Sequence, residues 1–382
     1  MTKRLLIFNF LIGAIAIFSC DSPTGQDTIN ANAASADTSK VTFTPERLYD
    51  GLQNPWGMAW LPDGRLLVTE KAGEILIFKD DKYTGQKVEG VPAVMSEGQG
   101  GLLDIQVHPD YSTNNWIYIS YSKPVKGGST TAIMRFKLDG NKMIEKKDIF
   151  EAKPYLPADF HFGSRIVFDK DKKLFFSVGE RGTMEKVWLL DNDHGKIHRI
   201  NDDGSVPEDN PFVKQSGAKP TIWSYGHRNP QGLVYDRENN RLWGIEHGPR
   251  GGDELNLIQP AKNYGWPKTS YGINYDGSVL TDKKEMPGVT NPTHYWVPSI
   301  APCGSVFVTS DKYTGWKGNI LVGALALRHI ARVQLSDVKF VAEEKLLQDS
   351  ARFRSVAQSP DGFIYAVTEG PGLLLKLVPG KK

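Results

Sequence analysis

Four glycine-rich segments carry polar side chains of the kinds that bind and transform small oxygen-rich molecules. They are EGQGGLLDI from Glu97, HFGSR from His161, SYGHRNPQGL from Ser224 and EHGPRGGDELNL from Glu246. Histidine titrates near neutral pH and suits proton transfer, arginine and amide groups hold anionic oxygens, and glycine lets the backbone approach a ligand closely. Glycine and proline also simply turn a chain, so any one segment alone is weak evidence. Together the four segments predict a site for an anionic, oxygen-rich ligand.

The last segment also offers oxygen ligands for a metal ion. The candidates are the backbone carbonyls of Gly248 and Pro249, the carboxylates of Asp253 and Glu254, and Tyr264 ten residues later. Hard oxygen donors, without thiols or paired histidines, favour Ca²⁺ over zinc. A solvated acidic turn accounts for the same spacing equally well, and from the spacing alone both interpretations stay open.

Composition and missing motifs exclude several classes of protein. The 46 Lys and Arg face 44 Asp and Glu, a formal net charge of +2, so the chain lacks the basic excess expected of a nucleic-acid-binding protein. The sequence has no Gly-x-Ser-x-Gly elbow, P-loop, HExxH or dinucleotide-binding Gly-x-Gly-x-x-Gly segment. Its two cysteines, Cys20 and Cys303, are too few for a disulfide framework or a cysteine-rich zinc site, and we expect Cys303 to be a buried thiol.

Short strands separated by turns must position the polar segments, because no sustained helical periodicity follows residue 41. A turn followed by an apolar strand recurs six times, as in LPDGRLLVTE and SPDGFIYAVTEG. The aspartates of the six copies are spaced 47, 59, 67, 75 and 50 residues apart, near or above the length of a four-stranded propeller blade. The pattern predicts an all-β, six-bladed β-propeller, and we expect the longer third to fifth units to carry the site over the central channel. The six aspartates are Asp63, Asp110, Asp169, Asp236, Asp311 and Asp361.

The N-terminus has the pattern of an export signal followed by a tether. Lys3 and Arg4 precede an almost wholly apolar run over residues 5–18, which as a helix would be about 21 Å long, short of the roughly 30 Å hydrocarbon core. The run ends at Ser19-Cys20, which resembles the lipobox of bacterial lipoproteins. We expect a lipid on Cys20 to be the membrane contact of an exported, cell-envelope protein. The predicted parts are a signal peptide at 1–19, a tether at 20–40 and the propeller at 41–382.

Taken in order, the polar segments resemble those of the soluble aldose sugar dehydrogenases, the relatives of soluble glucose dehydrogenase that depend on pyrroloquinoline quinone (PQQ) and Ca²⁺. The similarity starts near Asn54 and rests on EGQGGLL, HFGSR, GHRNPQG, DELN, NYGWP and ARFRSVAQSPDG. The fold of that family is a six-bladed propeller, in agreement with the six repeats.

The resemblance implies roles for individual residues. His161 is expected to be the general base that takes the proton of the sugar's anomeric hydroxyl while hydride passes from C1 to the quinone. Arg228 is expected to stabilise negative charge on the quinone oxygen. The residues that match cofactor contacts of the family are Gln99, Arg228, Asn229, Tyr275, Arg352 and Arg354.

For calcium, the resemblance implies two sites. Gly248 and Pro249 match positions whose carbonyls hold the ion that also binds PQQ, and Glu254 and Tyr264 match a second, structural site. One departure from the family pattern stands out: Ala326 or Leu327 occupies the place of a lysine that contacts the cofactor. Arg328 is the side chain expected to take over that contact.

These observations predict an enzyme that oxidises aldose sugars at C1 to lactones. Its electrons would go to an external acceptor, since the chain has no Cys-x-x-Cys-His haem attachment segment. Two other functions stay open from the sequence: a non-catalytic propeller that binds carbohydrate or another envelope protein, and a calcium-dependent lactonase.

Overall fold

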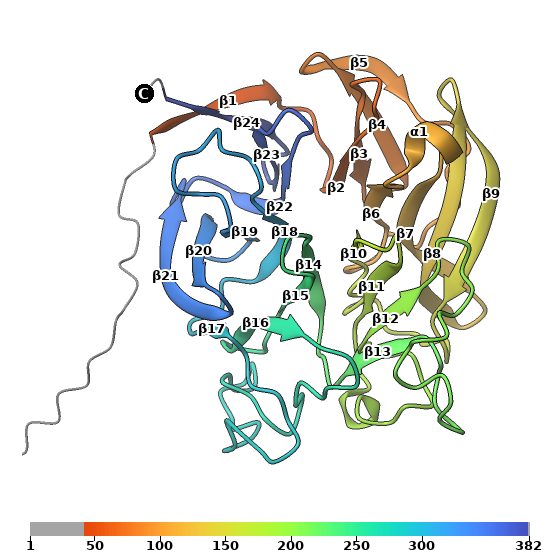
Figure 1. The fold of residues 1–382 in the computed structure, drawn as a ribbon, viewed down its shortest axis with the longest axis vertical. Coiled ribbons are helices and arrows are strands. Elements are labelled where there is room, and N and C mark those ends of the chain that lie inside the picture. The colour runs from red at the N-terminus through yellow and green to blue at the C-terminus, as the bar shows by residue number, and fades with distance from the viewer. Residues whose placement is uncertain (1–41, 381–382) are drawn as a thin grey trace, which may run out of the picture. The chain divides into compact units, whose positions relative to one another are not determined.

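A computed structural model describes residues 42–380, and these residues form six four-stranded antiparallel sheets. The sheets surround a centre that one edge strand of each sheet faces (Figure 1). The predicted six-bladed β-propeller is therefore confirmed. The signal peptide, the tether and Cys20 lie outside the described residues and stay predictions. Among residues 42–380, no helix is long and apolar enough to cross a bilayer.

The blades follow one another along the chain, each running from its innermost to its outermost strand. Blade 1 is β2 (Pro55–Trp60), β3 (Leu66–Glu70), β4 (Glu74–Lys79) and β5 (Lys82–Lys87). Blade 2 is β6 (Leu102–Val107), β7 (Ile117–Val125), β8 (Gly128–Asp139) and β9 (Lys142–Glu151). Blade 3 is β10 (Ile166–Phe168), β11 (Leu174–Val178), β12 (Lys196–Ile200) and β13 (Ile222–Tyr225).

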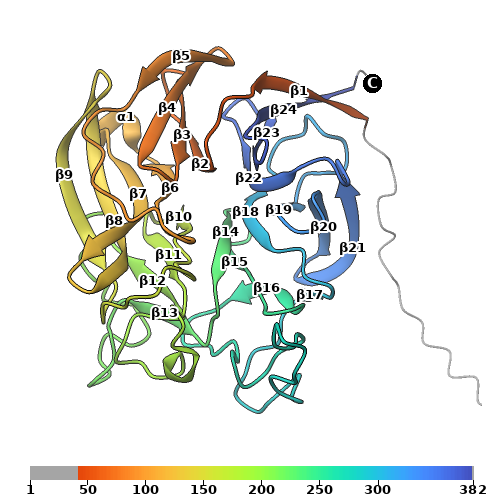
Figure 2. The ribbon, with the colours of Figure 1, turned by 180° about the vertical axis from the view of Figure 1, so that it is seen from behind.

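Blades 4 and 5 repeat the pattern, and blade 6 closes the ring. Blade 4 is β14 (Pro230–Asp236), β15 (Arg241–Glu246), β16 (Asp253–Ile258) and β17 (His294–Trp296). Blade 5 is β18 (Pro302–Phe307), β19 (Ile320–Ala324), β20 (Ile330–Ser336) and β21 (Lys339–Leu346). Blade 6 joins β22 (Arg352–Gln358), β23 (Ile364–Glu369) and β24 (Leu374–Pro379) to β1 (Phe43–Tyr49). The pairing of β1 with β24 joins the two ends of the propeller, which is visible from both sides (Figures 1 and 2).

The recurring aspartates lie where the first strand of each blade turns into the second. Asp169 accepts hydrogen bonds from the backbone N–H groups of Asp171 and Lys173, both at 2.8 Å, and Asp63 accepts one from Arg65 at 3.0 Å. A short carboxylate that bonds its own turn in this way stabilises the turn locally. The repeat seen in the sequence is thus the repeat of one turn per blade. The turn of blade 2 also carries the single-turn helix α1 (Tyr111–Asn114).

Strand order also decides where the functional segments lie. Because each blade is antiparallel, the connections from second to third strand and those between blades meet at the end of the ring opposite the aspartate turns, which we call the mouth face. Of the residues expected to form the site, most lie on such connections or at the strand ends beside them. The connection over 179–195, with its short 3-10 helix (Met184–Lys186), is one of the longer ones.

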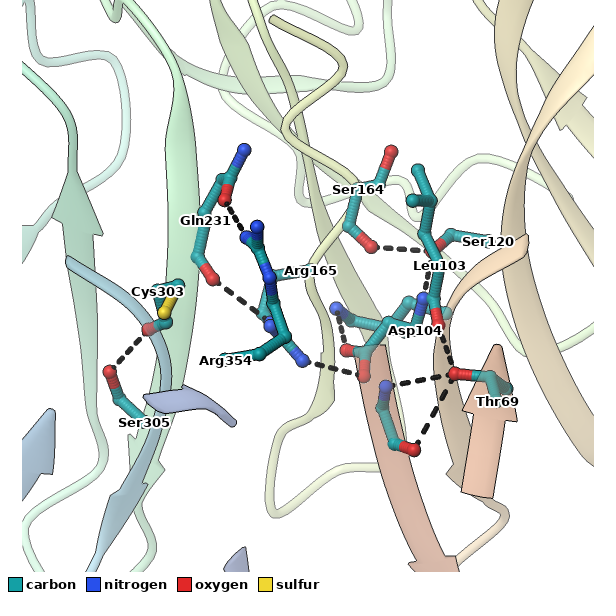
Figure 3. Close-up of polar contacts among 12 residues, drawn as sticks. Thr69, Leu103, Asp104, Ser120, Ser164, Arg165, Gln231, Cys303, Ser305 and Arg354 are labelled. Carbon is teal, nitrogen blue, oxygen red and sulfur yellow. Dashed lines mark hydrogen bonds and ion pairs between the residues drawn. The ribbon is translucent and has the colours of Figure 1, made fainter. Parts of the chain in front are cut away.

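Buried polar contacts tie the inner strands together around the central axis (Figure 3). Arg165, only 4% exposed, donates from Nη1 to Asp104 Oδ1 at 2.9 Å and from Nε to the Gln231 carbonyl at 3.0 Å. Gln231 in turn accepts a hydrogen bond from Arg354 Nη1 at 2.9 Å. Cys303 is buried, as expected, and its thiol donates to the Phe353 carbonyl at 2.9 Å. These contacts connect blades 2, 3, 4, 5 and 6.

Candidate active site

A histidine and a carboxylate from neighbouring connections meet on the mouth face. His161 Nδ1 is hydrogen-bonded to Glu180 Oε1, and the carboxylate of Glu180 is almost fully buried behind it. The His161 side chain is 12% exposed. Because Nδ1 is committed to Glu180, Nε2 is the ring nitrogen left to face a ligand.

Burial lowers the pKa of His161 below its usual 6.5, and the nearby Arg228 guanidinium lowers it further, whereas the hydrogen bond to Glu180 opposes both. The imidazole is therefore neutral at physiological pH, with a lone pair available at Nε2. A neutral imidazole held in one tautomer by a carboxylate is suited to accept a proton.

The backbone around His161 is fixed from two sides. His161 has a left-handed φ of 55°, and its N–H donates to Gln99 Oε1 at 2.9 Å. The Gln99 N–H donates to the Asp159 carbonyl at 2.7 Å. Across from them, a Cβ at Gly179 would lie 2.0 Å from the His161 carbonyl oxygen, so only glycine allows this close approach. The predicted contact residue Gln99 thus also holds the base in place.

Arg228 and Asn229 lie beside this pair, as the sequence predicts. The Arg228 carbonyl accepts a hydrogen bond from the Glu180 N–H at 2.8 Å, and Asn229 Oδ1 accepts one from the Gly163 N–H at 3.1 Å. Arg228 Nη1 donates to the His247 carbonyl at 3.3 Å. Arg228 Nε and His247 Nε2 are buried without a hydrogen-bond partner in the described part of the chain. Such unpaired buried groups suit a polar ligand with carbonyl and acidic oxygens.

Two glutamates approach each other below Arg228. Glu246 accepts hydrogen bonds from His227 Nδ1 at 2.9 Å and from the Arg228 N–H at 2.8 Å. Asn256 Nδ2 donates to Glu246 and to Glu254, at 3.1 Å each. Burial and the Glu246 carboxylate raise the pKa of Glu254 to about 8. Like charges held this close in a buried space favour either a proton or a cation between them.

The donors around Glu254 suit calcium. Asn256 Oδ1 is buried without a hydrogen-bond partner among residues 42–380, and because Nδ2 of this amide donates to both carboxylates, the amide would have to rotate to present its oxygen to an ion there. A small pocket at these carboxylates is lined by Glu246, Glu254, Gly248 and Tyr264. Carboxylate, amide and carbonyl oxygens are the ligands that Ca²⁺ prefers. No group of three or more His, Cys, Asp or Glu side chains in the described chain is arranged as a metal cluster, so backbone and amide oxygens would have to complete the set.

The side chains of Asp253 and Tyr264, unlike that of Glu254, form hydrogen bonds that hold the neighbouring loops. Asp253 Oδ1 accepts the Gly248 N–H at 2.8 Å, and Oδ2 accepts Ser299 Oγ and the Ile300 N–H, both at 2.7 Å. This carboxylate therefore fixes the loop that presents the Gly248 and Pro249 carbonyls. The Tyr264 hydroxyl donates to the Leu257 carbonyl at 2.6 Å, so only its backbone carbonyl is free for a metal.

At the far side of the mouth, two arginines share one carboxylate. Arg354 Nε donates to Glu369 Oε1 at 2.7 Å, and Arg352 Nη2 lies 3.4 Å from Glu369 Oε2. Both arginines lie on β22 and point to the same side, as their spacing of two predicts. Two positive charges with one counter-charge leave room for an anionic ligand.

Two expected contacts are not brought to this centre. Tyr275 is 72% exposed, on the connection between β16 and β17, and its cofactor contact stays a prediction. Arg328 was expected to replace the missing lysine, but its exposed guanidinium donates to the Ser350 carbonyl at 3.0 Å. Leu327 and Arg328 both have left-handed φ values, 55° and 46°, and this local turn places the Arg328 side chain against the neighbouring connection.

The sequence analysis did not identify Glu180, nor the position of Glu246 beside Arg228 and Glu254. Glu180 lies 19 residues after His161, with no motif joining the two, and they meet because β10 and β11 pair. Glu246 was noted only as the start of a glycine-rich segment. Its position as the last residue of β15, one residue before the mouth-face loop, was the signal available.

Comparisons with known proteins agree with this geometry. Residues 52–376 match the family model described as Glucose / Sorbosone dehydrogenase. The chain is 39% identical to the aldose sugar dehydrogenase YliI of Escherichia coli, over 89% of this chain and 94% of that protein. It is 26% identical to quinoprotein glucose dehydrogenase B of Acinetobacter calcoaceticus, over 98% of this chain and 95% of that protein.

Solved structures are similar over the same region. The apo-form of the soluble aldose sugar dehydrogenase from Escherichia coli superposes with a TM-score of 0.85 at 39% identity, covering 89% of this chain and all of that one. The PQQ-bound aldose sugar dehydrogenase of Streptomyces coelicolor gives a TM-score of 0.72 at 28% identity, covering 89% and 99%. Because the family model matches residues 52–376, most of this chain, the chain belongs to the glucose/sorbosone dehydrogenase family.

Proposed function

We propose that this protein oxidises aldose sugars at C1 to the corresponding lactones, using PQQ and Ca²⁺, and passes the electrons to an external acceptor. The observation that carries the proposal is the pair His161 and Glu180: a neutral imidazole, backed by a buried carboxylate at Nδ1 and with Nε2 not used in that contact, beside the charge of Arg228. A module that only binds carbohydrate has no need of such a base.

The chain's own residues divide the work. His161 Nε2 takes the proton of the anomeric hydroxyl, and Glu180 stabilises the imidazolium that forms. When bound, PQQ supplies the hydride acceptor and calcium polarises it. Arg228, Asn229, Arg352 and Arg354 would hold the cofactor's oxygens, and the Gly248 and Pro249 carbonyls would hold its calcium ion. Glu254 and the Tyr264 carbonyl would hold the second calcium ion.

A titration followed by an assay tests the proposal. Purified protein is titrated with PQQ, with and without Ca²⁺, and binding is followed by absorbance. The loaded protein is then assayed with glucose, galactose, xylose and maltose and a dye acceptor. Calcium-dependent binding and turnover of at least one sugar are expected, and His161→Ala should lose turnover while keeping PQQ affinity. Binding without turnover of any sugar would contradict the aldose assignment and favour a binding propeller, whereas lactone hydrolysis without PQQ would favour a lactonase.

We also propose that the protein is exported and held in the cell envelope by a lipid on Cys20. The support is the order of Lys3, Arg4, the apolar run at 5–18 and Cys20 in the sequence. Cys20→Ser should move the protein from the membrane fraction to the soluble fraction. A Cys20→Ser protein that stayed in the membrane fraction would contradict the lipid anchor.

A further inference from the structure

Lys71 is a cation in the mouth that neither the sequence motifs nor the family resemblance singles out. It is the first residue after β3, on the mouth face, and its Nζ donates to the Gly98 carbonyl at 2.7 Å. Gly98 precedes Gln99, whose side chain accepts the His161 N–H. The ammonium group therefore lies beside the segment that holds the catalytic histidine.

The backbone of Lys71 is rigidly placed. Its N–H donates to the Asn54 carbonyl at 3.1 Å, and its carbonyl accepts the Leu102 N–H at 3.0 Å. A Cβ at Gly101 would lie 2.4 Å from the Lys71 carbonyl oxygen, so the backbones at Lys71 and Gly101 pack together with no room for a side chain. A long side chain that starts from a fixed backbone is well suited to place its charge in one region.

The charges around Lys71 do not balance. Its pKa is lowered by partial burial and by the Arg354 guanidinium, and Glu369 opposes the shift. Glu369 already forms ion pairs with Arg352 and Arg354, so it is not a counter-charge for Lys71 alone. The second contact of Arg354 is to the neutral Gln231 side chain (Figure 3). A partly buried surplus of positive charge costs free energy until an anion occupies the space between the cations.

At residues 326–328, where the family resemblance predicts a lysine, no side chain replaces that cationic contact. Ala326 has no charge, Leu327 is 43% exposed, and the Arg328 guanidinium is directed to the Ser350 carbonyl. Lys71 comes from blade 1, on the other side of Arg354 from this connection. A cation supplied by blade 1 would fill the role that blade 5 has lost.

We propose that Lys71 supplies the cationic contact to a carboxylate of the bound quinone cofactor, together with Arg354, and that Arg328 does not take part. The inference rests on the proposed PQQ-dependent function. It adds a contact from the first blade to a cofactor site that the motifs place on blades 2 to 6.

A PQQ titration of variants tests the inference through affinity. The wild type, Lys71→Met, Lys71→Arg and Arg328→Met proteins are titrated by absorbance at fixed Ca²⁺ and at two salt concentrations. Because a hydrogen bond to a charged group is lost, Lys71→Met should raise Kd about ten-fold or more at low salt. The difference should shrink at high salt, since screening weakens charge contacts. Lys71→Arg should keep most of the affinity, and Arg328→Met should match the wild type.

Melting temperatures of all four proteins control for folding. A Lys71→Met protein that melts like the wild type and binds PQQ equally tightly would overturn the inference and leave the proposed function intact. An Arg328→Met protein with weakened binding would also contradict it. If the wild type itself bound no PQQ, the proposed function would fail and the inference with it.

Discussion

His161 Nδ1 and Glu180 Oε1 are hydrogen-bonded across two connections of the mouth face, and the contact fixes which imidazole nitrogen faces the ligand. The Glu180 carboxylate raises the pKa of His161, but by less than burial lowers it, so this pKa stays below its usual 6.5. A base with a lowered pKa stays unprotonated through the neutral range, and this gives the site a defined dependence on pH.

The first prediction concerns that pH dependence. Only the neutral imidazole accepts a proton, so kcat/KM for an aldose should be constant near neutral pH and fall as pH drops through the pKa of His161. Because burial and Arg228 lower this pKa, the fall should be centred below pH 6.5. Rates measured from pH 4.5 to 8 check it, with PQQ occupancy followed separately at each pH. A loss of activity centred above 6.5 would contradict the assignment of His161 as the base.

The second prediction is for Glu180→Gln. The carboxylate raises the pKa of His161, so its removal should move the acid limb of the pH profile to lower pH. The amide also no longer stabilises the imidazolium, and kcat should fall by roughly ten- to a hundred-fold, part of the 10²–10⁴ that general base catalysis contributes. PQQ affinity should be unchanged. Glu185→Gln, on the same connection but exposed, is the matched control, and a Glu180→Gln enzyme with the wild-type profile would exclude the positioning role.

The sequence predicts the fold more completely than it predicts the site. Six blades follow from the six aspartate turns because each turn is a local feature that sequence spacing records, and in three of them, at Asp63, Asp169 and Asp236, the aspartate accepts hydrogen bonds from its own turn. The proximity of His161, Arg228 and Asn229 could be predicted for a similar reason, since each lies in a compact motif. Glu180 was missed because its contact with His161 depends on how two strands pair. The position of the Arg328 side chain could not be predicted, because a left-handed turn directs it to the Ser350 carbonyl.

The third prediction concerns calcium and stability. Glu254 and Glu246 repel each other in a partly buried space, and a bound Ca²⁺ would relieve this repulsion. At free calcium one hundred times Kd, the ion should stabilise the folded state by about 2.7 kcal/mol, which a thermal melt in calcium and in chelator measures. Glu254→Gln should melt at or above the wild type in chelator, because the repulsion is removed, and gain little in calcium. A Glu254→Gln protein with the full calcium increment would exclude Glu254 as a ligand.

The last prediction concerns the contacts around the axis. Asp104 and Arg165 are both buried, and the carboxylate also accepts the Ile166 N–H at 2.9 Å. Asp104→Asn leaves the Arg165 charge without its partner, which costs roughly 3–5 kcal/mol for a buried pair and should lower the denaturant midpoint accordingly. Combining it with Arg165→Leu should cost less than the sum of the two single changes, because the charge is then gone. Glu74→Gln, which breaks the exposed pair of Glu74 with Lys87, is the control and should leave the midpoint unchanged. Additive losses in the double variant would mean that the two side chains stabilise the inner strands independently rather than as a pair.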